Sequence, residues 1–129
     1  MKALICGLGS IGKRHLENLE RLGFSCGEIA LYRTGKGTRS FGDQVERNHH
    51  HRHPVFNDVD AACAFQPTIT IIANPTSLHV PFAVKAAQAG SHLFIEKPLS
   101  HSLEGIEPLI NEVHKRGLVA TLAYNLRCH

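Results

Sequence analysis

Short apolar runs along the chain alternate with segments in which apolar residues recur every three or four positions. The first pattern is typical of buried strands and the second of helices that cover a sheet. The predicted strands are residues 3–6, 28–32, 54–56, 68–73, 92–95 and 118–122. Helices are predicted over residues 11–22, near 59–65, from Thr76 or Ser77 to just before Gly90, and from Ser102 to Arg116. The alternation predicts an α/β fold, a doubly wound and mostly parallel sheet with helices on both faces.

One helix and one long segment fit this alternation less well. Pro108 lies inside the last predicted helix, where a proline either kinks a helix or marks its real start. Pro81 causes no such conflict, because it falls in the first turn of its predicted helix. Residues 35–52 have the weakest pattern of the chain, and we expect a loop region or a mobile helix there.

A glycine-rich turn joins the first predicted strand to the first predicted helix. Its sequence is Gly7-Leu8-Gly9-Ser10-Ile11-Gly12. In a strand–turn–helix unit the first glycine permits a tight turn, the second lets the main chain approach a pyrophosphate, and the third brings helix and sheet together. The phosphates then meet the free N–H groups at the positive end of the helix. We interpret the turn as a dinucleotide-binding (Rossmann) fingerprint, with a purely structural glycine turn as the alternative.

The composition of the 129-residue chain is that of a soluble globular domain. With 43% hydrophobic and 19% charged residues, the chain is expected to form one domain that is neither disordered nor embedded in a membrane. No signal peptide is recognisable before the first strand. The formal charge of +3, without a long basic run, gives no reason to expect a nucleic-acid partner.

Several cysteine and histidine patterns in the chain do not have the spacing of catalytic or metal sites. The four cysteines lack metal-type and redox-type spacing, which favours a reducing, cytoplasmic setting and no metal site. Adjacent histidines, as in 49–53, rarely converge on one ion, so we expect a surface segment there. Tyr32 and Lys36 form a Y-x-x-x-K pattern, which in short-chain dehydrogenases belongs on a helix and is here a coincidence. His15, on the first helix, is interpreted as a packing or hydrogen-bonding residue.

Two further motifs follow the fourth and fifth predicted strands. Ala73-Asn74-Pro75-Thr76-Ser77-Leu78-His79 comes after the fourth strand, and Glu96-Lys97-Pro98-Leu99-Ser100 comes after the fifth. Together with the glycine turn they resemble the N-terminal half of the glucose–fructose oxidoreductase/inositol dehydrogenase family, from Met1 to about Arg127. Members of that family are two-domain NAD- or NADP-dependent enzymes that oxidise or reduce sugars, cyclic polyols and related small molecules.

The resemblance implies roles for residues in all three motifs. It places Pro75 and Thr76 in the cofactor cleft, with His79 beginning the next helix. It places Glu96 and Lys97 near the nicotinamide, with Lys97 reaching the substrate hydroxyl and a cis bond before Pro98. Ligands of open α/β sheets bind at the carboxyl ends of strands, where a lysine stabilises charge on an oxygen as hydride leaves its carbon. The candidate cofactor-binding residues are Gly7, Gly9, Ser10, Ile11, Gly12, Arg33, Thr34, Asn74, Pro75, Thr76, His79, Glu96 and Lys97, and Lys97 is also the candidate catalytic residue.

The resemblance covers only part of a family member, because the family also has an antiparallel β-sheet domain that binds substrate. We expect residues 1–122 to form the dinucleotide-binding domain and residues 123–129 to begin the connection to a substrate domain that this chain lacks. The chain alone is expected to bind nucleotide without full catalysis, and a non-catalytic nucleotide sensor or regulatory module is the alternative. We also expect a homo-oligomer, and an apolar face exposed beside the last strand, 118–122.

The choice between NAD and NADP depends on the end of the second predicted strand. NAD enzymes place an Asp or Glu there, about 20 residues past the glycines, to accept from the ribose hydroxyls. This chain has Tyr32-Arg33-Thr34-Gly35-Lys36 instead, with no carboxylate. Arg33 is suited to pair with a 2′-phosphate, and Thr34 adds a donor. We therefore predict that NADP is preferred, and NAD stays open.

Overall fold

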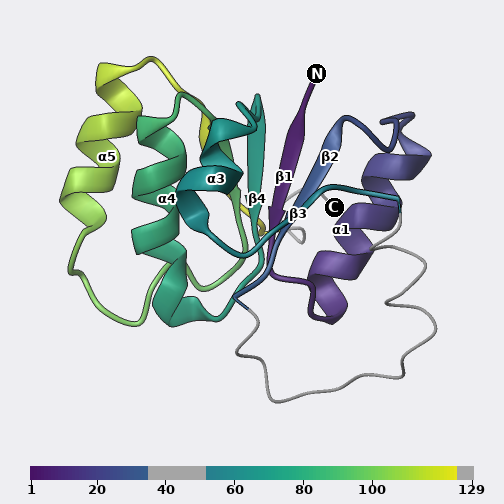
Figure 1. Ribbon diagram of the computed structural model, residues 1–129. Helices are drawn as coiled ribbons and strands as arrows, with labels where there is room; N and C mark the ends of the chain where they lie inside the picture. The colour runs from purple at the N-terminus through teal and green to yellow at the C-terminus, as the bar shows by residue number, and fades with distance from the viewer. Residues whose placement is uncertain (35–51, 125–129) are drawn as a thin grey trace.

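The described residues of the protein form a six-stranded, all-parallel sheet in the order β3-β2-β1-β4-β5-β6. This computed structural model describes residues 1–34 and 52–124 (Figure 1). The strands are β1 (Ala3–Cys6), β2 (Ile29–Tyr32), β3 (Val55–Phe56), β4 (Ile69–Ile72), β5 (His92–Ile95) and β6 (Ala120–Leu122). The helices are α1 (Ser10–Arg21), α3 (Val59–Ala64), the 3₁₀ turn η1 (Thr76–Leu78), α4 (His79–Gln88) and α5 (Ile106–Lys115). This strand order is that of doubly wound dinucleotide-binding folds, so the predicted fold class is confirmed.

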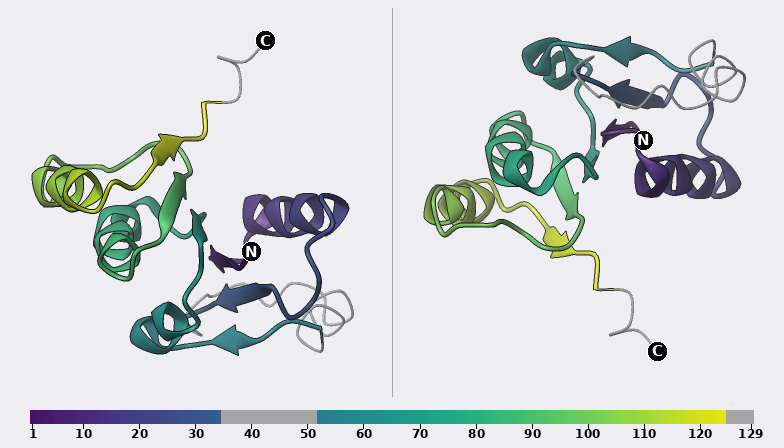
Figure 2. Two further views of the ribbon diagram at one scale, coloured as in Figure 1. Left: turned by 90° about the horizontal axis from the view of Figure 1, so that it is seen from above. Right: turned by 90° about the horizontal axis from the view of Figure 1, so that it is seen from below.

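The described helices lie on both faces of the sheet. Figure 2 shows α1 on one face and α3, α4 and α5 on the other. Alternate residues of β1 serve the two layers, because successive side chains of a strand point to opposite faces. Ile5 packs with Leu16 of α1, whereas Leu4 packs with Phe82 of α4. The sheet is therefore buried on both sides in its centre, as the apolar sequences of its strands predicted.

The start of α5 differs from the prediction. The helix begins at Ile106, so Ser102 is not its cap and that prediction was wrong. Pro108 lies in the first turn and marks the start of the helix rather than a kink. The residue before the helix is Gly105, with a φ of 76°, and a Cβ there would lie 2.9 Å from Val80 Cγ1. Close packing of this turn against α4 therefore sets where α5 begins.

Other element boundaries differ by a few residues. The α-helix α4 begins at His79, after the 3₁₀ turn, so neither Thr76 nor Ser77 caps it as predicted. Pro81 does fall in its first turn. The last strand is shorter than predicted and begins at Ala120. The prediction for residues 35–52 and the predicted connection at 123–129 lie mostly outside the described residues.

The described residues include neither a membrane-spanning helix nor a cluster of metal-type ligands. No helix within residues 1–34 and 52–124 is long and apolar enough to cross a bilayer. Across the same two ranges, no His, Cys, Asp and Glu side chains gather as a metal site. The expectation of a surface segment was wrong for His53, which is buried because its ring nitrogens lie 3.0 Å from Glu20 Oε1 and 3.2 Å from the Cys26 carbonyl oxygen. His49–His51 lie outside the described residues.

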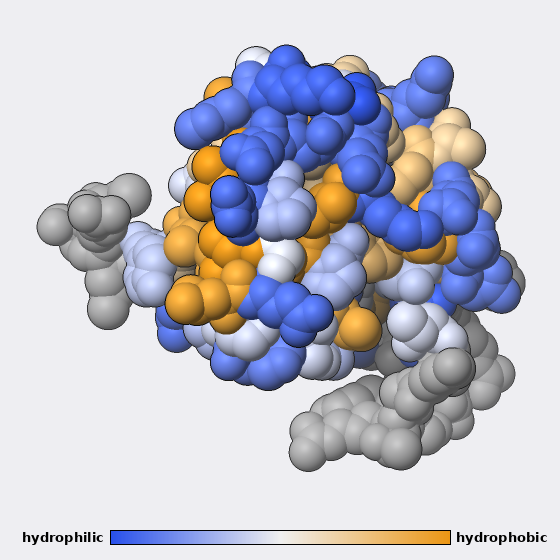
Figure 3. Space-filling view, turned by 90° about the vertical axis from the view of Figure 1, so that its left-hand side faces the viewer, coloured by the Kyte–Doolittle hydropathy of each residue, from blue (hydrophilic) through white to orange (hydrophobic). Residues whose placement is uncertain are grey.

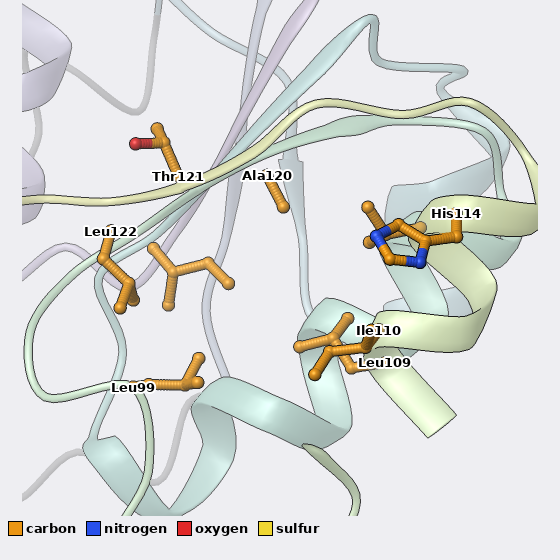
Figure 4. Close-up of a pocket in the computed structure, with 9 residues that line it drawn as sticks. Leu99, Leu109, Ile110, His114, Ala120, Thr121 and Leu122 are labelled. Carbon is orange, nitrogen blue, oxygen red and sulfur yellow. The ribbon is translucent and has the colours of Figure 1, made fainter. Parts of the chain in front are cut away.

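An apolar groove of about 260 Å³ lies between α5 and the edge strand β6. Apolar side chains gather on the face of the molecule where α5 lies (Figure 3). Figure 4 shows Leu99, Leu109, Ile110 and Leu122 around the groove, from the β5–α5 loop, α5 and β6. Ile110 is 48% exposed. The apolar face predicted beside the last strand is therefore present.

Candidate dinucleotide-binding site

The three sequence motifs meet at the carboxyl edge of the sheet. β1, β4 and β5 are neighbours, and Cys6, Ile72 and Ile95 lie level with one another in the register. Each motif begins directly after one of these residues. The glycine turn (residues 7–12), the loop after β4 (residues 73–79, the Asn74 loop) and the loop after β5 (residues 96–100, the Lys97 loop) therefore lie side by side. Open α/β sheets bind ligands at this edge, outside the carboxyl ends of their strands.

The first and third glycines of the turn are required by close contacts within the protein. Gly7 has a φ of 93°, and a Cβ there would lie 2.7 Å from the Ala73 carbonyl oxygen and from the Asn74 nitrogen. A Cβ on Gly12 would collide with the carbonyl oxygen of Gly7. The turn is therefore packed against the β4 loop, and α1 against the turn, so closely that side chains are excluded.

The second glycine, Gly9, faces open space instead. No protein atom lies within 4 Å of a Cβ built there. Gly9 is also the N-cap residue of α1 and provides no side-chain hydrogen bond to the helix. The first-turn residues Ser10, Ile11 and Gly12 have N–H groups without intrahelical acceptors, as at the start of every α-helix. This open helix N-terminus fits a pyrophosphate, whose oxygens would accept from those groups.

Asn74 supplies an unpaired amide at the same edge. Its side-chain oxygen and nitrogen are both buried, and neither has a hydrogen-bond partner among residues 1–34 and 52–124. A buried polar group without a partner costs about 1–3 kcal/mol, which makes an unpaired amide an unusual feature in a folded protein. A ligand with donors and acceptors beside the glycine turn would satisfy it, and the nicotinamide ribose of a dinucleotide has both.

The catalytic candidate, Lys97, is exposed at the neighbouring strand end. It forms no hydrogen bond or ion pair with the described part of the chain, and the Lys97–Pro98 peptide bond is cis, as the resemblance implied. The preceding residue, Glu96, is held: its Oε1 lies 2.6 Å from Nε2 of His15 on α1. The His15 ring also packs edge-on against Phe94 of β5, with ring centroids 5.3 Å apart. His15 thus packs and forms a hydrogen bond, as its position in the sequence predicted.

His79 joins the other two loops of the site. Its ring is buried, with Nε2 2.7 Å from the Asn74 carbonyl oxygen and Nδ1 2.9 Å from the Pro98 carbonyl oxygen. The ring therefore contacts main-chain oxygens of both loops that line the predicted cleft. Pro75 and Thr76, in the Asn74 loop, are exposed and partly exposed at the start of η1.

Arg33 and Thr34 lie beside the glycine turn. The N–H of Gly7 donates to the Tyr32 carbonyl oxygen at 3.1 Å, and the N–H of Arg33 donates to the Phe56 carbonyl oxygen at 2.9 Å. These bonds fix the main chain of Arg33 at the end of β2, which pairs with β1. A Rossmann fold binds the adenosine ribose at this position. Tyr32 instead packs against the Phe82 ring at 4.6 Å between centroids, and burial raises the pKa of its hydroxyl. Lys36 lies outside the described residues.

Residues 1–124 match the oxidoreductase family with an NAD-binding Rossmann fold. The chain belongs to this family. The family match covers the glycine turn and the Asn74 and Lys97 loops, and their placement at one sheet edge agrees with it.

The proteins to which the chain is similar include inositol and sugar-nucleotide dehydrogenases. The chain is 27% identical to myo-inositol 2-dehydrogenase of Thermotoga maritima, over 98% of this chain and 37% of that protein. It is 28% identical to scyllo-inositol 2-dehydrogenase (NAD(+)) of Bacillus subtilis, over 98% of this chain and 36% of that protein. The solved UDP-N-acetylglucosamine 3-dehydrogenase of Acidithiobacillus ferrooxidans matches with a TM-score of 0.78 at 28% identity, over 100% of this chain and 40% of that one. The chain thus spans little more than a third of the length of these relatives.

Proposed function

We propose that the chain is the cofactor-binding part of a dehydrogenase that transfers hydride between NAD(P) and a sugar, a cyclic polyol or a related small molecule. The observation that carries the proposal is that the open space at Gly9, the unpaired amide of Asn74 and the exposed ammonium of Lys97 lie at one edge of the sheet. Titration of the chain into NADH tests it, because the fluorescence of the reduced nicotinamide changes when the cofactor binds.

In this proposal, the residues at this edge of the sheet have different roles according to their position. The N-terminus of α1 and the turn before it hold the pyrophosphate, and the Asn74 loop orients the nicotinamide half. When bound, the nicotinamide accepts or donates the hydride. Lys97 donates a hydrogen bond to the substrate oxygen and stabilises the negative charge that develops there as hydride leaves the adjacent carbon.

We propose further that NADP is preferred over NAD. The family description names NAD, and support for the finer preference comes from this chain's own residues. Arg33 stands where NAD enzymes place a carboxylate, and its main chain is fixed beside Gly7 by the strand contacts. A guanidinium in that position pairs with the 2′-phosphate that distinguishes NADP. Calorimetry with NADPH and NADH at equal salt compares the two directly.

We also propose that the residues that select the substrate lie outside this chain, because its relatives are almost three times as long. The chain is then expected to bind dinucleotide without turning over sugars or polyols by itself. A panel of sugars and cyclic polyols incubated with the chain and NAD(P), followed at the absorbance of the reduced nicotinamide, tests this. Turnover by the chain alone would contradict it.

Self-association is proposed on the basis of β6 and the groove beside it. β6 is the last strand of the sheet order, and within the described part of the chain it pairs on one side, with β5. An open strand edge next to exposed apolar side chains favours pairing with a second copy of the chain.

We propose a reducing, cytoplasmic location for the protein. The free thiols of Cys6, Cys26 and Cys63 support this proposal.

A further inference from the structure

The residues on both sides of Lys97 are each held by a histidine. Glu96, just before it, has its carboxylate 2.6 Å from His15 Nε2. Pro98, just after it, has its carbonyl oxygen 2.9 Å from His79 Nδ1. Lys97 itself is exposed, so the main chain at its base is fixed while its side chain is left to meet a ligand.

The two histidines come from the two elements that build the rest of the site. His15 lies on α1, the helix whose N-terminus faces the open space at Gly9. His79 is the first residue of α4 and also contacts the Asn74 carbonyl oxygen, at 2.7 Å. The Lys97 loop is thus tied on one side to the proposed pyrophosphate site and on the other to the loop with the unpaired amide.

The contacts of His79 and His15 differ in how deeply they are buried and in how many groups they involve. His79 is 2% exposed, and its loss would remove the contacts that its ring makes with two partly buried main-chain carbonyl oxygens. The side chains of His15 and Glu96 are 15% and 14% exposed, and their bond joins the surface of α1 to a strand end. A bond between a carboxylate and an imidazole N–H is charge-assisted and therefore stronger than a neutral one. Loss of the His15 side chain would remove one hydrogen bond at this partly exposed position, whereas loss of His79 would affect the contacts of two main-chain groups.

We propose that His15 and His79 are positioning residues that fix the main chain around Lys97, so that its ammonium meets the nicotinamide end of a dinucleotide bound at the glycine turn. The proposal rests on the proposed function, since it assumes that a dinucleotide binds there. It assigns to α1 a second role, because the helix that receives the pyrophosphate also holds the carboxylate beside the lysine.

Acetylation of Lys97 with and without NADH tests this inference. A brief pulse of acetic anhydride followed by peptide mass spectrometry gives the acetylation rate of Lys97, with Lys115 on α5 as the internal reference. In the wild-type chain bound NADH is expected to slow the acetylation of Lys97 relative to Lys115, because the nicotinamide lies against the amine. The affinity for NADH, measured by calorimetry, reports separately on the glycine turn.

Two substitutions of His15 separate its hydrogen bond from its packing. His15→Phe keeps a ring against Phe94 and removes the donor to Glu96. It is expected to bind NADH within about threefold of the wild-type affinity but to lose the protection of Lys97. His15→Gln restores an N–H donor at a similar reach and is expected to restore the protection. His114→Phe, the same change at an exposed position on α5, is expected to leave both readouts as in the wild type.

His79→Gln, which removes the ring that contacts both carbonyl oxygens, is expected to weaken the protection of Lys97 as well. The His15 variants decide the outcome if this buried position does not tolerate the change. Full protection of Lys97 in an NADH-bound His15→Phe chain would overturn the inference. A wild-type chain that does not bind NADH at all would overturn the proposed function, and the inference with it.

Discussion

The carbonyl oxygen of Gly7 occupies the space that a side chain on Gly12 would need. The two residues are the ends of the glycine turn, and their contact holds α1 against the carboxyl end of β1. Gly9, between them, has no protein atom near the position of a Cβ. Close packing therefore requires glycine at positions 7 and 12, whereas at Gly9 the space is open for a ligand.

Gly12→Ala should destabilise the protein because the new methyl group would meet main-chain atoms that have little room to move. We expect the free energy of unfolding to fall by about 1–3 kcal/mol. Gly9→Ala is the matched control, since Gly9 has a φ of −67° and open space around it. Its free energy of unfolding should stay within about 1 kcal/mol of the wild type. Urea denaturation of both variants measures the difference, and equal losses would contradict the packing argument.

The carboxylate of Glu28 should make stability depend on pH. It accepts from the main-chain N–H and the hydroxyl of Ser25, at 2.9 Å each, and from the amino group of Met1. These contacts, the Ser25 main-chain bond first, lower the pKa of Glu28 from an ordinary 4.5 to about 2. The unfolded chain therefore binds the proton more readily, so this stabilisation is complete above pH 4.5 and is lost as the pH falls toward 2.

Melting temperatures of wild type and Glu28→Gln across this pH range test the sign. The wild type should melt higher at pH 7, and the two curves should converge as the pH approaches 2. Other titrating groups cancel in the difference because both proteins carry them. A difference that does not change with pH would show that the carboxylate charge contributes nothing.

Replacement of Arg33 should change which cofactor binds better. A charge-assisted contact between an arginine and a phosphate contributes about 1.5–3 kcal/mol, or roughly ten- to a hundredfold in affinity. Arg33→Ala should therefore lose most of the preference for NADPH and leave the affinity for NADH nearly unchanged. Calorimetry with both cofactors at one salt concentration measures this. Tighter binding of NADH than NADPH by the wild type would end the assignment of NADP.

A charge placed in the groove beside β6 should reduce self-association. Leu122→Lys introduces an ammonium into an apolar surface that a second copy would have to bury unpaired. Leu22→Lys is the control, because Leu22 is 76% exposed at the end of α1, away from β6. Sedimentation velocity should show a concentration-dependent oligomer for wild type and the control, and a monomer for Leu122→Lys. A wild-type chain that stays monomeric at high concentration would contradict the proposal.

The sequence allowed the order of strands and helices to be predicted because each element carries its own hydrophobic period. It also placed the three motifs at one edge, since loops after parallel strands share a side of the sheet. For α5 the alternative that Pro108 marks the start of the helix was right, but the predicted cap, Ser102, was wrong. The residue before the helix is Gly105, which packs against Val80, and local capping signals do not report such a contact between elements. The hydrogen bond between His15 and Glu96 joins residues 81 positions apart. It could not be predicted because the sequence around each residue carries no information about the other.

The most direct test of the central claim is calorimetric titration of NADPH and NADH into the wild-type chain and into Gly9→Val. We expect the wild type to bind, and Gly9→Val to fold normally, with an unchanged circular dichroism spectrum, but to bind neither cofactor. The reason is that the valine side chain would fill the open space where the pyrophosphate belongs. No binding by the folded wild-type chain, or equal binding by Gly9→Val, would contradict a dinucleotide site at the glycine turn.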